Sequence, residues 1–432
     1  MIQKIFVFEF ISGGGFNTTS IPSSLFCEGF AMLRSIVDDF KKLGYHLITL
    51  LDYRIEHLSS LLNVNLIEIV RPSDNFIELY KSLVKKSNYC FVIAPEFSNI
   101  LLNLSQIVKE NDRKLLSVDL TGITIASSKY KTYKYFLENK LKTPPTYLIP
   151  LKEEYPDLQF LKRKVMDLGF PLIIKPDDGV GAESIHLLKS QKELKSLLIR
   201  FKEKFERLRK YVVQTYIEGI PLSLSLLNLN WSKTRANPIL LSINTQELLL
   251  EDNKKDSEYF GGYTPYLDYK GIQKKIARII QTVKFPEFSS FFGIDFVLNK
   301  DQIVFIEINP RLTTPYVGLR RILSYNPMKF LMIKDHSEKI ERFHINGNSI
   351  FRRIEFQYAG SYDKKDLNQK IFSFCEDKIP ECITPPINFD ENKEYSCFIA
   401  TKETSLKKSK ERIEFIISFL EENGFNKLKG YE

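Results

Sequence analysis

Three side chains that could bind a metal ion lie close together near the segment FIEINPR, residues 305–311. Glu307 and Asn309 stand two residues apart in an expected strand, so their side chains leave it on the same face. Asp295 lies on the preceding expected strand and would be beside them if the two strands pair. Two carboxylates and an amide oxygen suit Mg²⁺ that bridges nucleotide phosphates. The alternative is a polar strand face that is wetted by solvent.

Two cations accompany these ligands. Arg311 is expected on the face of Glu307 and Asn309, where a guanidinium could stabilise negative charge developing on an oxygen. Lys175 ends an apolar run and precedes the polar segment DDGVGAES, residues 177–184. Within that segment Gly179 and Gly181 let backbone N–H groups approach phosphate oxygens, and Ser184 adds a donor. The segment is not a P-loop, because the chain has no G-x-x-x-x-G-K-S/T, and an ordinary turn is the alternative.

Two further segments are candidate nucleotide-binding elements only in combination with the residues named above. The backbone of VVQTYIEG, residues 212–219, could contact the edge of an adenine, with Gln214 as a side-chain partner, although it also looks like an ordinary core strand. Lys129 opens an expected helix that ends before Pro144 and Pro145. Taken alone, Lys129 is a surface lysine.

The elements that position these residues follow an α/β pattern of apolar runs and amphipathic segments. A parallel sheet is expected over residues 1–122, with strands at 5–8, 46–52, 66–70, 89–96 and 114–119 and helices at 28–44 and 76–86. Farther on we expect helices at 129–141 and 193–209, strands at 170–176, 185–188 and 211–219, and a hairpin whose two strands join at Asn299–Asp301. A strand at 351–360 and a strand leading into a helix at 397–425 end the pattern.

Chain length, the length of the apolar runs and the cysteine content exclude several classes of protein. The 432 residues suffice for two to four domains. No apolar run reaches the roughly eighteen residues of a membrane span, and Glu9 interrupts the first one, which favours a buried strand over a signal peptide. We therefore expect a cytoplasmic protein with no membrane partner. Five cysteines without a C-x-x-C pair favour reduced structural thiols.

The net charge of +9 raises the question of a nucleic-acid partner. Lys and Arg lie among Asp and Glu along most expected helices, without a long basic block, so we expect no nucleic acid. A basic nucleic-acid-binding protein stays open as an alternative, and it would show steep salt-dependent retention on DNA or RNA.

The order of these features carries more information than any one of them. A lysine before a helix and two prolines, a lysine before a glycine loop, a hinge strand, an acidic strand and E-I-N-P-R together resemble the ATP-grasp superfamily of carboxylate–amine ligases. The resemblance implies a fold of class α/β plus α+β: an N-terminal parallel-sheet pre-ATP-grasp domain and a two-subdomain ATP-grasp fold. We expect domain bounds at 1–122, 123–330 (divided into 123–215 and 216–330) and 331–432, the last being a C-terminal α+β extension.

The resemblance also implies roles by position, with ATP and Mg²⁺ or Mn²⁺ as cofactors. Ser128 stands where many members have Asp before the lysine, a tolerable departure. Pro221 falls near the position of the usual ribose-binding glutamate, so ribose recognition is the least secure role, with Glu218 as a candidate substitute. The implied roles are phosphate binding by Lys129 and Lys175, a mobile phosphate loop with Gly179, Gly181 and Ser184, an adenine hinge with Gln214, Tyr216 and Ile217, metal binding by Asp295, Glu307 and Asn309, and stabilisation of an acyl phosphate by Arg311.

A closer likeness rests on EFISGGGF, the helix start EGFAML, FGGYTP and EINPRLTTPYVGL. Together they look like the archaeal tyramine–glutamate ligase group of methanofuran biosynthesis and its bacterial relatives. The implied reaction joins a carboxylate, such as glutamate, to an amine, such as tyramine, through an acyl phosphate, and it releases ADP and phosphate. From about residue 335 the chain has a region that the short archaeal enzymes lack, so a different substrate stays open. Another ATP-grasp amino-acid or peptide ligase, or a non-catalytic nucleotide-binding protein, remains an alternative, and a homo-oligomer is left open.

The stretch EFISGGGF looks at first like a dinucleotide loop. No third glycine opens a helix at the right spacing, so that fingerprint fails. Because it follows the first strand, at the edge where open α/β sheets bind ligands, we predict that Ser12, Gly13, Gly14 and Gly15 line an acceptor pocket opposite ATP. The alternative is a purely structural turn. A bulky residue at Gly14 should then raise the KM of the acceptor more than that of ATP.

Overall fold

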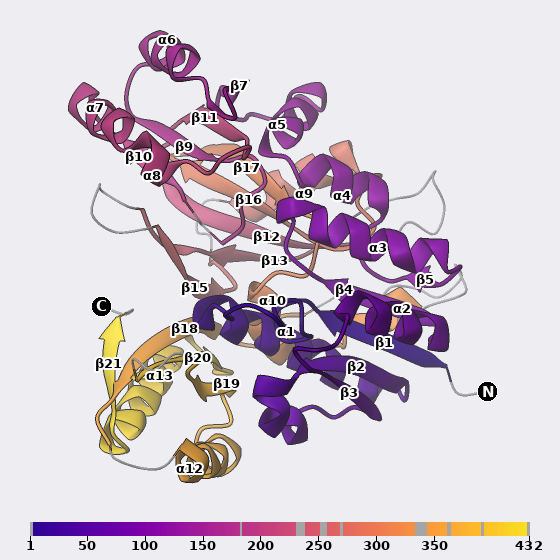
Figure 1. The fold of residues 1–432 in the computed structure, drawn as a ribbon. Coiled ribbons are helices and arrows are strands. Elements are labelled where there is room, and N and C mark those ends of the chain that lie inside the picture. The colour runs from indigo at the N-terminus through magenta and orange to yellow at the C-terminus, as the bar shows by residue number, and fades with distance from the viewer. Residues whose placement is uncertain are drawn as a thin grey trace.

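The computed structural model of the chain describes residues 3–181, 184–229, 238–250, 257–267, 271–332, 344–360, 364–389 and 393–429. In Figure 1 the N-terminal sheet lies at the lower right and the C-terminal strands at the lower left. The remaining strands lie mostly above both.

The N-terminal region is a five-stranded parallel sheet in the order β3-β2-β1-β4-β5. Its strands are nearly continuous apolar runs, as expected of a sheet covered on both faces by helices. The predicted parallel sheet is confirmed, and the expected bounds 46–52, 66–70 and 76–86 match those of β2, β3 and α2. The elements are β1 Lys4–Glu9, α1 Ser23–Lys42, β2 His46–Asp52, η1 Tyr53–Leu61, β3 Leu66–Val70, α2 Phe76–Lys86, β4 Tyr89–Ile93, η2 Phe97–Asn99, α3 Ile100–Glu110, β5 Lys114–Leu115 and α4 Leu120–Ala126.

A four-stranded antiparallel sheet in the order β10-β9-β11-β6 follows. It carries Lys175 near the end of β9 and Gln214 near the end of the neighbouring β11. Its elements are α5 Lys129–Glu138, β6 Thr146–Ile149, β7 Leu151–Lys152, β8 Tyr155–Pro156, α6 Leu158–Leu168, β9 Leu172–Pro176, β10 His186–Leu188, α7 Gln191–Ile199, α8 Phe201–Lys204 and β11 Tyr211–Thr215.

The single helix expected at residues 193–209 is wrong in its length. The structure has the two short helices α7 and α8, and the chain leaves helical conformation before Phe205. The Phe205 side chain is buried, and its ring meets the ring of Tyr211 edge to face with 4.7 Å between centroids. We attribute the end of the helix to this tertiary contact, which the local pattern does not reveal.

A second antiparallel sheet, in the order β13-β12-β16-β17, contains the predicted hairpin. The hairpin register places Asp295 opposite Glu307 and Gly293 opposite Asn309. Helix α9 buries the apolar stripe Ile272, Ile276 and Ile280. The elements are β12 Ile220–Asn228, β13 Ile239–Thr245, α9 Ile272–Val283, β16 Ser290–Asn299 and β17 Gln302–Asn309.

The C-terminal residues share a sheet with earlier parts of the chain. β15 pairs with β18, from Gly261 opposite Arg352 to Thr264 opposite Ser349, so the boundary expected near residue 330 passes through one sheet. Strands this far apart in the chain pair through tertiary structure, which local patterns do not encode. The elements are β14 Glu247–Leu249, β15 Glu258–Thr264, α10 Pro315–Ile322, α11 Met328–Met332, β18 Ser349–Tyr358, α12 Lys364–Asp377, β19 Cys382–Ile387, β20 Glu394–Ala400, α13 Leu406–Glu422 and β21 Phe425–Lys429.

Helix α1 contacts the N-terminal sheet, the C-terminal sheet and the helix that follows the acidic hairpin. It contacts β1 on one side and β19, β20 and α10 on others. The buried Asp39 on α1 accepts hydrogen bonds from Arg320 Nε and from the Tyr316 hydroxyl on α10, both at 2.7 Å. This network holds α1 in a fixed position relative to the residues that follow β17.

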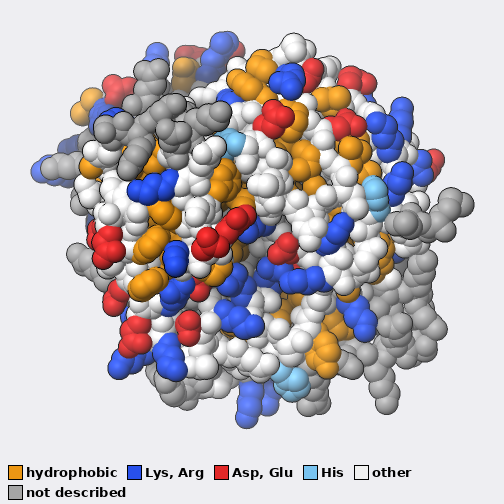
Figure 2. All heavy atoms as spheres, turned by 90° about the horizontal axis from the view of Figure 1, so that it is seen from below, with side chains coloured by type: hydrophobic (Ala, Val, Ile, Leu, Met, Phe, Trp, Pro, Cys, Tyr) orange, Lys and Arg blue, Asp and Glu red, His pale blue; other side chains and the backbone are white. Residues whose placement is uncertain are grey.

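The surface carries mixed charge on the face drawn in Figure 2, where Lys and Arg side chains lie among Asp, Glu and uncharged groups. Within the described part of the chain, every helix is too short or too polar to cross a membrane.

Candidate active site

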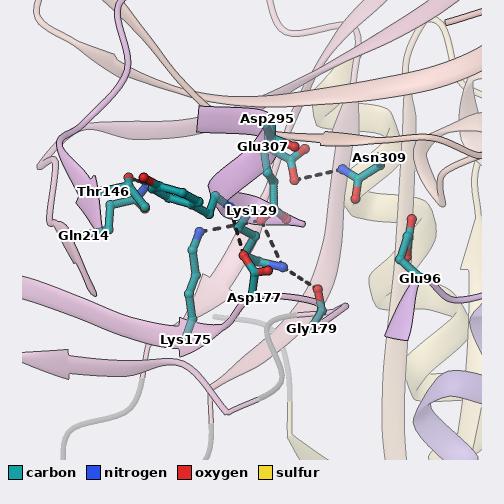
Figure 3. Close-up of polar contacts among 12 residues, drawn as sticks. Glu96, Lys129, Thr146, Lys175, Asp177, Gly179, Gln214, Asp295, Glu307 and Asn309 are labelled. Carbon is teal, nitrogen blue, oxygen red and sulfur yellow. Dashed lines mark hydrogen bonds and ion pairs between the residues drawn. The ribbon is translucent and has the colours of Figure 1, made fainter. Parts of the chain in front are cut away.

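A cavity of about 210 Å³ lies where the two four-stranded sheets, the C-terminal sheet and α1 meet. Figure 3 shows a close-up of polar side chains in and beside this cavity, with Lys129 and Lys175 close to Glu307. Of the residues predicted from sequence, those that line the cavity are Lys175, Gly181, Gln214, Tyr216, Ile217, Asp295, Glu307, Asn309 and Arg311.

The hairpin brings the three expected metal ligands together. Asn309 Nδ2 donates to Asp295 Oδ2 at 3.1 Å, and Gln246 Nε2 donates to Asp295 Oδ1, also at 3.1 Å. Burial, followed by the charge of Glu307, raises the pKa of Asp295. Two carboxylates that face each other in a buried site repel, so a cation placed between them would be stabilised.

The donor set fits a divalent cation whose coordination is completed by a ligand. Among the described residues, no group of three or more His, Cys, Asp or Glu side chains is arranged to hold a metal. Asp295, Glu307 and the amide oxygen of Asn309 supply only part of an octahedral shell. Mg²⁺ commonly takes one or two carboxylates and completes its shell with phosphate oxygens and water.

Two ammonium groups converge on the same carboxylate. Lys129 Nζ lies 3.5 Å and Lys175 Nζ 3.6 Å from Glu307 Oε2. Burial lowers the pKa of Lys175, and the charge of Glu307 partly offsets this. Burial by itself would raise the pKa of Glu307, but the two lysines outweigh it and the pKa is lowered. The site therefore holds two cations and an ionised carboxylate at the position where a triphosphate is expected.

Asp177 fixes Lys129 against the glycine segment, and the sequence did not single it out. Its backbone oxygen accepts from Lys129 N at 2.8 Å, and its Oδ1 accepts from Tyr130 N at 2.9 Å. Ser128 caps α5 by accepting from Lys131 N at 3.1 Å. A carboxylate at a helix N-terminus is a stabilising arrangement. The Asp that follows Lys175 by two positions was the available signal.

Arg311 reaches the cavity by a route that strand alternation does not describe. β17 ends at Asn309, so Arg311 lies in the following turn. Its Nε donates to Glu96 Oε1 at 3.0 Å, and both side chains are largely buried. Glu96 follows β4 of the N-terminal sheet, and its Oε2 is buried without a hydrogen-bond partner in the described structure. Sequence patterns did not identify Glu96 as a site residue, because 215 residues separate it from Arg311.

The expected adenine hinge lines the apolar part of the cavity together with Ile173 and Phe296. The Gln214 side chain is buried, and its Nε2 donates to Thr146 Oγ1 at 2.7 Å. The side-chain amide nitrogen of Gln214 is therefore already hydrogen-bonded within the protein. The backbone N–H groups of Thr215 and Tyr216 donate to Pro145 O and Pro171 O, both at 3.1 Å, so the backbone of Ile217 is the part of the hinge that an adenine edge could meet.

The glycine segment lies only partly in the cavity. Gly181 lines it with φ +61°, whereas the Gly179 carbonyl accepts from Lys129 Nζ at 2.5 Å. Ser184 is described but is not among the residues that line the cavity. Ala182 and Glu183 lie outside the described residues. A phosphate loop over Gly179–Ser184 thus stays a prediction.

The stretch EFISGGGF is packed inside the N-terminal region and does not line the cavity. Ser12 is fully buried, and its backbone N–H donates to the buried carboxylate of Glu9 at 2.7 Å. A Cβ at Gly13 would lie 2.5 Å from Glu9 O, and one at Gly15 would lie 2.4 Å from the Phe10 ring. The alternative of a structural turn therefore accounts for Ser12, Gly13, Gly14 and Gly15, and this geometry does not support the acceptor pocket.

Replacing Gly14 by alanine should destabilise the protein and leave both substrate KM values unchanged. Gly14 has φ +89°, and an added Cβ would lie 2.6 Å from Val70 Cβ. We expect the free energy of unfolding to fall by about 1–3 kcal/mol, as measured by chemical denaturation. Gly44→Ala is the matched control, since Gly44 has φ +82° and open space around it. A raised acceptor KM at unchanged stability would restore the pocket role.

Residues 126–315 match the family model of an ATP-grasp domain, and residues 45–123 match that of the pre ATP-grasp 3 domain. The chain is 26% identical over 351 residues to a tyramine–L-glutamate ligase from Methanocaldococcus jannaschii, covering 80% of this chain and 94% of that protein.

Two solved structures share the fold. An ATP-grasp superfamily protein described as putative, from Archaeoglobus fulgidus, aligns with TM-score 0.57 at 20% identity, over 93% of this chain and all of that one. The biotin carboxylase domain of a Hydrogenobacter thermophilus 2-oxoglutarate carboxylase, in complex with MgADP, ADP and bicarbonate, aligns with TM-score 0.67 at 15% identity, over 99% of this chain and 91% of that one.

Proposed function

Because the chain belongs to the ATP-grasp superfamily, we propose that it is an ATP-dependent ligase that joins a carboxylate to an amine. The carboxylate first accepts the γ-phosphoryl group of ATP and becomes an acyl phosphate. The amine then attacks the acyl carbon, and ADP and phosphate are released.

One observation carries this proposal. Lys129 and Lys175 both lie within 3.6 Å of Glu307 Oε2. Lys175 lines the cavity with Asp295, Asn309 and Arg311, whereas Lys129 lines a smaller hollow that shares Glu307 and Asn309 with it. These groups come from two different sheets, the start of α5 and the turn after β17, so their meeting is a tertiary arrangement. A polar strand face wetted by solvent would not place two largely buried ammonium groups on the same carboxylate oxygen.

The residues of the cavity supply what phosphoryl transfer to a carboxylate requires. Lys129 and Lys175 bind phosphate oxygens and neutralise the charge that builds up between ADP and the acceptor. Asp295, Glu307 and Asn309 would hold Mg²⁺, which supplies further neutralisation when it is bound. Arg311 is held by Glu96 and stabilises the oxyanion that forms when the amine adds to the acyl carbon. The surrounding apolar residues limit hydrolysis of the acyl phosphate by excluding water.

We propose glutamate and tyramine, or a related amine, as substrates. The support is the similarity to the tyramine–L-glutamate ligase over most of both chains. A different amino-acid or peptide ligase is the alternative within this class. A non-catalytic nucleotide-binding protein is the alternative outside it.

The test is an assay of ATP conversion over a panel of amines and carboxylates that includes tyramine and L-glutamate. We expect ADP with one pair of substrates, and a fall of about 10²–10³-fold in Arg311→Ala because one oxyanion donor is lost. Arg278→Ala, on the exposed face of α9, is the control. Formation of AMP would exclude the acyl-phosphate route. Nucleotide binding without ADP from any pair would favour the non-catalytic alternative.

A further inference from the structure

Glu28, on the first turns of α1, contributes an acidic side chain to the cavity. Its neighbours Cys27 and Gly29 are buried in the protein core. Glu28 instead lines the cavity that also contains Arg311. The helix carrying it belongs to the N-terminal region, on the other side of the cavity from the acidic hairpin.

The carboxylate of Glu28 has no partner of its own in the described structure. No hydrogen bond or ion pair from a described residue reaches its oxygens. The two arginines that act on it through their charge are both engaged elsewhere. Arg353 Nη2 lies 3.2 Å from Glu258 Oε2, and Arg311 Nε lies 3.0 Å from Glu96 Oε1.

An acid in this setting is suited to binding a cation. Withdrawal from water disfavours an ionised carboxylate unless a positive group compensates it. Burial raises the pKa of Glu28 to about 7, although Arg353 and Arg311 oppose the shift. A carboxylate whose pKa lies near neutrality is also an effective proton acceptor.

Glu28 shares the cavity with the polar residues Tyr259 and Thr314 as well as with the expected phosphate-binding groups. Burial raises the pKa of the Tyr259 hydroxyl, and the negative charge of Glu28 adds to this shift. The Tyr259 hydroxyl lies 3.1 Å from Thr314 Oγ1, and both residues line the cavity. Lys175, Asp295 and Glu307 form the phosphate side. Glu28 is thus an acid of the same cavity that α1 supplies and that the acidic hairpin does not, and the charge of Arg311, the arginine expected to meet the acyl group, acts on it.

We propose that Glu28 binds the ammonium group of the amine substrate and accepts its proton before the nitrogen attacks the acyl phosphate. This inference rests on the proposed ligase function and adds to it the residue that recognises and activates the nucleophile.

The proton balance of this step is complete. The ammonium nitrogen loses one proton to the Glu28 carboxylate, and its lone pair forms the new bond to the acyl carbon. The bond from that carbon to the phosphate oxygen then breaks. A second proton leaves nitrogen with the departing phosphate, and the amide keeps the third. Glu28 returns its proton to solvent when the product leaves.

Hydroxylamine separates this role from the rest of the reaction, because it is uncharged at neutral pH and can attack an acyl phosphate without losing a proton first. The experiment compares wild type with Glu28→Gln, using L-glutamate as the carboxylate, or whichever carboxylate of the panel supports ADP release. The nucleophile is either hydroxylamine or the amine that is most active in the panel, with tyramine tried first. Products are measured as hydroxamate and as amide.

We expect Glu28→Gln to lower amide formation by about 10²–10⁴-fold, the range of general base catalysis, and to leave hydroxamate formation close to wild type. Glu28→Asp keeps the charge and should restore part of the amide rate. Asp38→Asn, on the same helix but outside the cavity lining, is the matched control and should behave as wild type.

Three results would overturn the inference. Amide formation that survives in Glu28→Gln would remove the role. If hydroxamate and amide formation fell equally and the KM of the carboxylate substrate rose, Glu28 would bind the ammonium group of that substrate and not that of the amine. Equal loss together with a lowered melting temperature would show a structural role. Wild type that yields neither hydroxamate nor amide with any pair would count against the ligase function itself.

Discussion

Replacing Lys175 by methionine is expected to lower the rate of ADP formation by about 10³-fold or more, the scale on which a cation acts on a transferring phosphoryl group. The Lys175 side chain is 5% exposed and its Nζ lies 3.6 Å from Glu307. Methionine has nearly the same length and suits the buried strand, so the fold should survive. A lower rate of ADP formation would therefore result from the missing positive charge.

The measurement pairs turnover with stability and ATP binding. Steady-state ADP formation gives the rate, calorimetric titration gives the affinity for ATP, and thermal unfolding gives stability. We expect the free energy of unfolding to fall by no more than about 2–3 kcal/mol in Lys175→Met, because removing one partner of a buried ion pair is destabilising but Glu307 keeps Lys129 as a partner. Lys192→Met, on the exposed side of α7, is the control. Near-normal turnover in Lys175→Met would remove Lys175 from the site.

Replacing Glu307 by glutamine should have a double effect. The amide keeps the shape but removes the charge shared by Lys129 and Lys175 and one of the expected metal ligands. We expect ADP formation to fall by about 10³-fold or more, because both phosphate orientation and charge neutralisation are lost. We also expect the free energy of unfolding to fall by about 2–3 kcal/mol, at or below the lower end for a fully buried pair, because the Glu307 side chain is 24% exposed.

A measurement of melting temperature separates the role of Glu307 as a metal ligand from its role as the partner of the two lysines. In wild type, ATP with Mg²⁺ should raise the melting temperature more than ATP with a chelator does, since ligands that bind only the folded state stabilise it. In Glu307→Gln this difference should shrink or vanish. Glu138→Gln, exposed on α5, serves as the control. A full Mg²⁺-dependent shift in Glu307→Gln would show that the metal is held without this carboxylate.

Local patterns accounted for much of the secondary structure and for the acidic hairpin. The strands at 46–52 and 66–70 and the helix at 76–86 match the structure, because their apolar spacing is read within one element. Asp295 meets Glu307 because a short turn sets the register of a hairpin. The meeting of Lys129 and Lys175 at Glu307 was expected from the order of motifs and is present, although their roles remain predictions.

Contacts between distant segments were beyond local reasoning. Gly14 of EFISGGGF lies against Val70, which belongs to β3, much farther along the chain. β18 completes a sheet begun by β15. Each depends on which surfaces meet after the elements have formed, and side-chain alternation carries no information about that choice.

The amino-acid sequence by itself determined the types of group available for chemistry and the faces on which neighbouring ones emerge, because strand and helix periodicities are local properties of the chain. Only the tertiary structure brought Glu96 to Arg311 and Glu28 to the same cavity. These contacts join an N-terminal sheet and helix to a turn more than two hundred residues later, and packing of whole domains decides them. The fold therefore selects which of many charged side chains share one buried site.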